Sequence, residues 1–203
     1  MGKIHGPWTI HHIPANLNFT PLALSLSGSH SWVDLRSVEK SEQSCIFSPS
    51  HCNNGISVSF KAYLSTNGIG YILSSGGKNS NGFSIYHDDG VMHFNVRDGQ
   101  NIWQVQGSYE SNAWHTFAMS WSHADGLTAV IGGDSTSVLR DTGGKTVTLT
   151  QASHSSLIIG RSTNMDGGVH ADIVLRDVAI WEEAIAQERM SALFVCNGER
   201  CNA

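Results

Sequence analysis

Alternating apolar and polar residues constrain this chain more than any other feature of its sequence. From Ile56 to Leu64, apolar residues occupy every second position, and Ser, Ser, Lys and Tyr lie between them. Successive side chains of a β-strand point to opposite faces of its sheet. The segment is therefore predicted to be a strand with one face in the core and the other toward solvent.

Turn residues separate many more short segments of this kind. Asp88-Asp89-Gly90 predicts a tight hairpin, because Asp-Gly tolerates positive φ angles. The other expected strands are Leu22–Leu26, Gly70–Ser74, Gly82–His87, Val91–Val96, Asn101–Gln106, His115–Trp121, Leu127–Ile131, Thr146–Thr150, Ser156–Ile159 and Asp172–Trp181.

Only one helix is expected. The segment Glu182–Val195 has apolar residues near helical spacing, and its first two residues are acidic, which favours a helix start. Residues 133–145 are expected to form a longer loop. Leu22–Leu26 is expected at the edge of a sheet.

These elements predict an all-β fold, an antiparallel two-sheet sandwich with one short C-terminal helix. The 203 residues are 40% hydrophobic and only 14% charged, which agrees with short strands and polar turns rather than helices. We expect one domain over residues 1–203, with its core at about 30–195.

Charge and hydropathy exclude two classes of partner. The formal charge is -5 and no basic run occurs, so a nucleic-acid surface is not expected. No apolar stretch approaches the roughly 20 residues that span a bilayer. Residues 1–6 do not form a secretion signal. We interpret the first few residues as a cloning remnant and any signal as already removed.

The four cysteines form two close pairs, Cys45/Cys52 and Cys196/Cys201. Neither pair has Cys-x-x-Cys spacing, so zinc or thioredoxin-like chemistry fits poorly. Two local disulfides fit better and indicate an oxidising compartment, although four cysteines allow three pairings. Asn18 begins the one glycosylation sequon, which is compatible with secretion.

Three stretches together resemble a known family. They are Cys45–Cys52 followed by 55–60, Trp114–Trp121 followed by Asp125-Gly126-Leu127, and 157–161 followed by 177–181 and the expected helix. Their order resembles the laminin G-like/pentraxin-like branch of the concanavalin A-like sandwiches. The closest resemblance is to extracellular modules of adhesion-class G-protein-coupled receptors and related surface proteins. It covers about residues 30–195 and implies a jelly roll with Trp114, Trp121 and Trp181 in the core.

Some members of that family hold a calcium ion near acidic positions. Calcium prefers six to eight oxygen ligands, and the candidates here are Asn164 and Asp166, then Asp88 and Asp89. Ordinary turn chemistry is the favoured explanation of the same residues, because Asp and Asn bond nearby backbone amides. Arg176 stands where many relatives carry an acidic residue, and a cation there opposes a bound Ca²⁺.

Aromatic and imidazole side chains supply the other candidate sites. Trp103, Tyr86 and Gln104 are candidates for ligand binding, since rings stack on sugars and amides bond hydroxyls. A Trp at the position of Trp103 is more often a core residue. His87 and His93 lie on neighbouring expected strands. They share one face, as a metal pair requires, only if the strand register allows it.

The sequence carries no catalytic signature, and no enzyme activity is expected. The adjacent carboxylate pairs are Asp88-Asp89 on a turn and Glu182-Glu183 at a helix start, and neither suits a glycosidase cleft. The favoured function is an extracellular recognition or adhesion module, secreted or part of a larger receptor, that binds a protein partner. The alternative is a calcium-dependent lectin-like domain that binds glycans.

Overall fold

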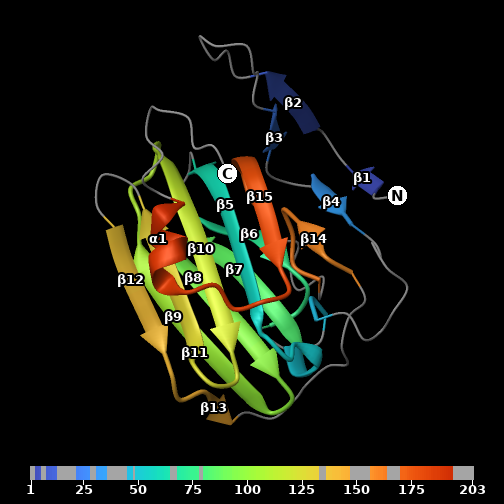
Figure 1. Ribbon diagram of the computed structural model, residues 1–203. Coiled ribbons are helices and arrows are strands. Elements are labelled where there is room, and N and C mark those ends of the chain that lie inside the picture. Colours follow the sequence, from blue (N-terminus) through green and yellow to red (C-terminus); the bar gives the residue numbers. More distant parts are fainter. Residues whose placement is uncertain are drawn as a thin grey trace.

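Two antiparallel β-sheets pack face to face in a computed structural model of the chain (Figure 1). The structure describes residues 3–5, 8–12, 22–27, 31–35, 45–47, 49–64, 68–77, 80–132, 136–146, 156–163 and 170–193. Among them no helix is long and apolar enough to cross a membrane.

One sheet has eight strands and the other has seven. The eight-stranded sheet runs in the order β1 (Lys3–His5), β4 (Trp32–Asp34), β14 (Ile158–Ile159), β6 (Ile69–Ser74), β7 (Gly82–Asp88), β8 (Val91–Asp98), β9 (Asn101–Ser108), β13 (Lys145–Thr146). The seven-stranded sheet runs in the order β12 (Thr136–Asp141), β11 (Gly126–Gly132), β10 (Trp114–Ser122), β5 (Ile56–Leu64), β15 (Ile173–Trp181), β3 (Leu22–Leu26), β2 (Trp8–His12). The two-sheet sandwich is as the sequence predicts.

Alternation along the strands builds the core between the sheets. In β5 the apolar positions from Ile56 to Leu64 are buried, and they meet β10 through pairs such as Phe60 opposite Phe117. These two rings stack with centroids 5.3 Å apart. Full burial of one such side chain stabilises the fold by about 1.5–3 kcal/mol. The central strands are therefore held in the core by their inward faces.

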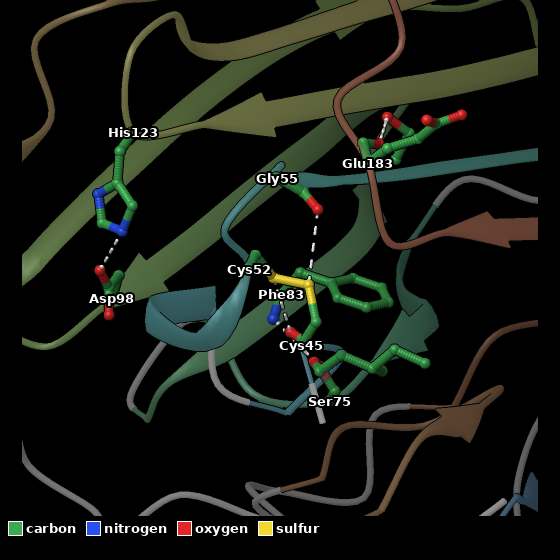
Figure 2. Close-up of a disulfide and its surroundings, with 10 residues drawn as sticks. Cys45, Cys52, Gly55, Ser75, Phe83, Asp98, His123 and Glu183 are labelled. Atoms are coloured by element: carbon green, nitrogen blue, oxygen red, sulfur yellow. Dashed lines mark hydrogen bonds and ion pairs between the residues drawn. A yellow bond between two sulfur atoms is a disulfide. The ribbon is translucent and has the colours of Figure 1, made fainter. Parts of the chain in front are cut away.

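A disulfide between Cys45 and Cys52 closes the loop that enters β5, as predicted (Figure 2). Both cysteines are buried against the core, and the loop contains the short 3-10 helix η1 (Pro49–His51). The Ser75 hydroxyl donates a 2.7 Å hydrogen bond to the Ile46 carbonyl and accepts one of 3.1 Å from the Phe83 amide. The Ser75 hydroxyl thus links the cystine loop to β7.

The helix α1 (Gln187–Ala192) packs on the outer face of the seven-stranded sheet (Figure 1). It is shorter than the expected helix over 182–195, and Glu182 and Glu183 precede it instead of forming its first turn. The reason is Ser57, whose hydroxyl donates to the Glu183 carbonyl at 2.7 Å and accepts from the Ile185 amide at 2.9 Å. These bonds hold the segment against the sheet in a non-helical form.

A β-bulge in β15 inverts which side chains of that strand face the core. Ile173 and Leu175 are buried before the irregularity between Arg176 and Ala179. After it, Trp181 pairs with Ser57 and packs in the outer cluster under α1, together with Met190. The expectation that Trp181 enters the main core is therefore wrong. The extra residue in the bulge turns its side chain to the other face.

Two expectations about the sheet edges are wrong as well. Part of the expected loop at 133–145 is the strand β12, an edge strand that pairs on one side only and so needs little apolar patterning. Leu22–Leu26 is an interior strand, because β2 covers its outer edge. Near the start of the chain, β1 pairs with β4 in one sheet and β2 with β3 in the other.

Candidate recognition surface

The predicted ligand residue Trp103 lies in the core. It is 7% exposed, and its ring meets Trp121 edge to face at 5.2 Å. Its outward neighbour Gln104 is exposed on the outer face of the eight-stranded sheet. Alternation along β9 separates the two residues, so they do not form one stacking platform.

Tyr86, the second predicted ligand residue, lies on that same outer face within an aromatic stack. Its ring centroid is 5.1 Å from that of Tyr71 and 4.5 Å from that of His93, whose plane is tilted by only 3°. Burial raises the pKa of Tyr86. The faces of the Tyr86 ring are covered by protein neighbours, which leaves little of it for a ligand.

Gln104 is the exposed end of a row of polar side chains across three strands. Its amide Nε2 donates to Asn95 Oδ1 at 2.9 Å, and Asn95 Nδ2 donates to Ser84 Oγ at 3.2 Å. Asn95 and Ser84 are buried. The row therefore satisfies its own hydrogen bonds and presents only the Gln104 end to solvent.

The predicted metal ligands are only partly placed. Asp88 and Asp89 lie at the β7–β8 turn, where Asp89 adopts a φ of 44°. Asn164 and Asp166 fall outside the described residues, as do Asn18, Cys196 and Cys201. In the described part of the chain, no group of three or more His, Cys, Asp or Glu residues is arranged to hold a metal ion. Calcium binding stays a prediction.

His87 and His93 do not form a metal pair. His87 lies opposite Met92 and His93 opposite Tyr86, so the two imidazoles point to opposite faces of the sheet. His87 is 2% exposed in the interior, and its Nδ1 lies 3.1 Å from the Tyr109 hydroxyl. Tyr109 is buried as well.

Among the Trp, Tyr and Phe residues whose side chains the structure describes, the most exposed is one that was predicted to lie in the core. Trp114 begins β10 and is 38% exposed. The other exposed large hydrophobic residues in the described part of the chain are aliphatic. It lies opposite Tyr63 of β5 on the outer face of the seven-stranded sheet, with ring centroids 6.0 Å apart. The alternation along this strand already indicates the position of Trp114. Because His115, Phe117 and the alternate residues after them face the core, Trp114 faces outward.

Arg176 lies over Trp114 and shares a carboxylate with Lys61. The guanidinium carbon of Arg176 lies 4.4 Å from the centroid of the Trp114 ring. Lys61 Nζ is 3.4 Å from Asp177 Oδ2, and Arg176 Nε is 3.9 Å from the same oxygen. A cation over an exposed indole contributes about 0.5–1 kcal/mol. The stacking orders Arg176 on the outer face, away from the interior.

Asp177 has an unusual backbone conformation at this place. It sits in the β15 bulge with a φ of 55°, which non-glycine residues adopt rarely, although Asp tolerates it better than most. Its neighbour Val178 is exposed. Bulges and such conformations cluster at functional sites, where they redirect side chains. We call this region the Trp114 surface, and its residues are Lys61, Tyr63, Trp114, Arg176, Asp177 and Val178.

A polar hollow of about 560 Å³ lies elsewhere on the same sheet, beside α1. Strands β10 to β12 line it on one side and α1 on the other. Its serines are already occupied: Ser120 bonds Ser57 at 3.1 Å, and Ser122 donates to Asp125 and accepts from the Asp125 amide. Arg140 donates to Gln187 at the start of α1. The polar side chains of the hollow are therefore already paired with one another, which leaves fewer free groups for a ligand than the Trp114 surface offers.

Known proteins share this architecture. A laminin G family model, described as the concanavalin A-like lectin/glucanases superfamily, matches residues 28–191. No curated protein matches the sequence. One similar solved structure is the receptor binding domain of botulinum neurotoxin C/D mosaic serotype, with a TM-score of 0.64 and 14% identity.

Two further toxin structures are similar. One describes cell entry of botulinum neurotoxin type C as dependent upon two ganglioside molecules (TM-score 0.63, 17% identity). The other is the binding domain of botulinum neurotoxin DC in complex with rat synaptotagmin II (TM-score 0.61, 16% identity). Each match covers 96% of this chain and 46% of the solved chain, so the chain spans just under half of these relatives. At these identities the likeness shows the fold.

Proposed function

Because the chain belongs to the concanavalin A-like lectin/glucanases superfamily, we propose that it is a non-catalytic extracellular module that binds a protein partner. The Trp114 surface would be its contact site. The observation that carries the proposal is the exposed Trp114 ring, held between Tyr63 and the Arg176 guanidinium. Trp, Tyr and Arg are the side chains that most often dominate binding energy at protein interfaces.

The chemistry of the surface supports binding in preference to turnover. It carries one carboxylate, Asp177, whereas hydrolysis of a glycosidic bond generally needs a pair. Its aromatic groups are already ordered by stacking, so a partner would lose little side-chain entropy in contacting them. A contact made by rigid aromatic side chains beside cations suits a protein surface with apolar and polar groups.

An extracellular location is supported by the Cys45–Cys52 disulfide, because such bonds persist in oxidising compartments. The partner would then be another secreted or cell-surface protein. Whether the chain acts alone or within a larger receptor does not alter the contact that we propose.

A glycan-binding function is the second candidate. It is favoured by one observation, that a structurally similar toxin is described as interacting with gangliosides. A calcium-dependent lectin of this kind would lose its ligand in EDTA, whereas recognition through the Trp114 surface would be indifferent to chelation.

The test is a parallel screen against displayed extracellular domains and against immobilised glycans, each with calcium and with EDTA. The variants are Trp114→Ser and the matched control Val138→Ser, since Val138 is 40% exposed on the edge strand β12 of the same sheet. We expect a protein ligand whose affinity falls at least tenfold in Trp114→Ser and is unchanged in Val138→Ser, since hot-spot truncation costs about 2 kcal/mol or more. Equal binding by both variants would overturn the proposal. A glycan signal abolished by EDTA would favour the lectin.

A further inference from the structure

The charges at the Trp114 surface do not balance. Lys61 and Arg176 share the single carboxylate of Asp177, so a positive charge remains at this face of a chain whose formal net charge is -5. The side chains of Lys61 and Arg176 are 30% and 24% exposed. A partially buried cation without a matching anion attracts a negative group more strongly than a fully solvated one.

Arg176 also has unused donors. No described residue accepts a hydrogen bond from its guanidinium; its Nε is buried and unbonded, so the two terminal Nη groups are the donors that a partner would meet. Stacking on Trp114 fixes the plane of the group without using its N–H bonds. A planar guanidinium with free N–H donors matches the two oxygens of a carboxylate, which it binds in a bidentate manner.

Asp177 is a weak internal partner for these cations. Its side chain is 54% exposed, and its contacts at 3.4 and 3.9 Å are ion pairs at the surface. Pairs of this kind contribute about 0–1 kcal/mol. Its backbone is held in the left-handed region by the bulge. A second carboxylate could therefore replace it at low cost.

From this arrangement we infer that the protein partner inserts a carboxylate side chain, flanked by apolar residues, between Lys61 and Arg176. Trp114 and Val178 provide the apolar contacts on either side, and Asp177 occupies the position only in the free protein. The inference rests on the proposed function and specifies the chemistry of the partner at that site. It applies to an acidic, apolar peptide segment.

The experiment uses two labelled peptides, Gly-Leu-Glu-Leu-Gly and its neutral counterpart Gly-Leu-Gln-Leu-Gly, titrated into the ¹⁵N-labelled chain. The indole N–H signal of Trp114 reports binding and is assigned from the Trp114→Ser variant. We expect a saturable shift with the Glu peptide, at least fivefold weaker binding of the Gln peptide, and weaker binding of the Glu peptide by Lys61→Gln and by Arg176→Gln.

Asp177→Asn separates internal competition from a general effect of charge. It should tighten binding of the Glu peptide severalfold, because the competing carboxylate is gone. Asp125→Asn changes the net charge equally, but Asp125 lies in the β10–β11 turn, outside the Trp114 surface. It should leave the affinity unchanged.

Three results would overturn the inference: no saturable shift, equal binding of both peptides, or equal tightening by Asp125→Asn and Asp177→Asn. The proposed function can survive this failure. If Trp114→Ser abolishes binding of a protein partner while Lys61→Gln and Arg176→Gln do not, the surface is correct and its acidic ligand is wrong. Thermal unfolding of every variant establishes that the fold is kept.

Discussion

The hydroxyl of Tyr109 and Nδ1 of His87 lie 3.1 Å apart in the interior of the sandwich. Both side chains are buried, and Nε2 of His87 has no hydrogen-bond partner. Nδ1 therefore bonds Tyr109, whereas Nε2 of the same imidazole stays unbonded. Burial lowers the pKa of His87 and raises that of Tyr109 to about 12, so both groups stay neutral over the ordinary pH range.

Acid should weaken the fold through His87. Its pKa is lowered by burial, which outweighs the opposing attraction of Asp88, Asp89 and Asp172. Below pH 6.5 the unfolded chain binds a proton there that the folded chain does not, so the free energy of unfolding falls as pH falls toward the lowered pKa. The slope is at most about 1.4 kcal/mol per pH unit for this group. Urea unfolding between pH 7 and 5 measures it, and His87→Gln should flatten the profile. An unchanged slope in that variant contradicts the assignment.

Alkali should weaken the fold through Tyr109. Its pKa rises from 10 in the unfolded chain to about 12 in the folded protein, so stability is complete below pH 10 and falls as pH rises to 12. The loss approaches about 2.7 kcal/mol. Tyr109→Phe should be less stable at neutral pH by about 1–3 kcal/mol, because it leaves a buried imidazole nitrogen unbonded. Its free energy of unfolding should depend less on pH above pH 10. A titration followed by absorbance at 295 nm should show that the tyrosine ionising at the highest pH is missing in this variant.

Ser57 should matter far more than its neighbour on the same face, Ser59. Ser57 donates to the Glu183 carbonyl, accepts from the Ile185 amide and lies 3.1 Å from the Ser120 hydroxyl. Ser57→Ala should cost about 1–3 kcal/mol because it leaves buried polar groups unbonded. Ser59→Ala is the control, since Ser59 is also buried but makes no hydrogen bond through its side chain. Chemical unfolding measures both, and equal costs would show that Ser57 does not anchor the segment before α1.

Replacing Cys45 and Cys52 together by alanine should destabilise the protein by about 2.5 kcal/mol on the chain-entropy model for a loop of this length. The Ser75 bonds to Ile46 and Phe83 should keep the loop in place in the folded state. We therefore expect an unchanged circular dichroism spectrum and a lower urea midpoint. A variant that fails to fold would show that the disulfide is needed to form the loop as well as to stabilise it.

Periodicity along single strands was enough to predict the sandwich and the inward residues of β5 and β10. The same periodicity places Trp114 on the outer face, and the prediction failed there because a large aromatic was expected to be core. The positions of residues that depend on partners distant in sequence could not be predicted in this way. The bulge at Asp177 breaks the period of two, and the register that pairs His87 with Met92 is set by the whole hairpin.

The edge strand β12 shows a different reason for failure. Its sequence from Thr136 to Asp141 is mostly polar and its side chains are largely exposed, so it lacks the apolar alternation of an interior strand. Its place is fixed partly by Asp141, whose carboxylate accepts hydrogen bonds from the amides of Gln104, Gly143 and Gly144. Backbone amides as partners cannot be identified from residue types alone.

The bulge in β15 sets the face on which the end of that strand presents its side chains. Strict alternation from Leu175 would bring Trp181 inward, but residues 177 and 178 together stand opposite Phe60 alone, so Ile180 faces inward and Trp181 faces outward beneath α1. Deleting one of these two residues would straighten the strand and keep this pairing, so Trp181 would stay beneath α1. The loss would fall instead on the exposed backbone that carries Asp177 and Val178, and therefore on the Trp114 surface alone.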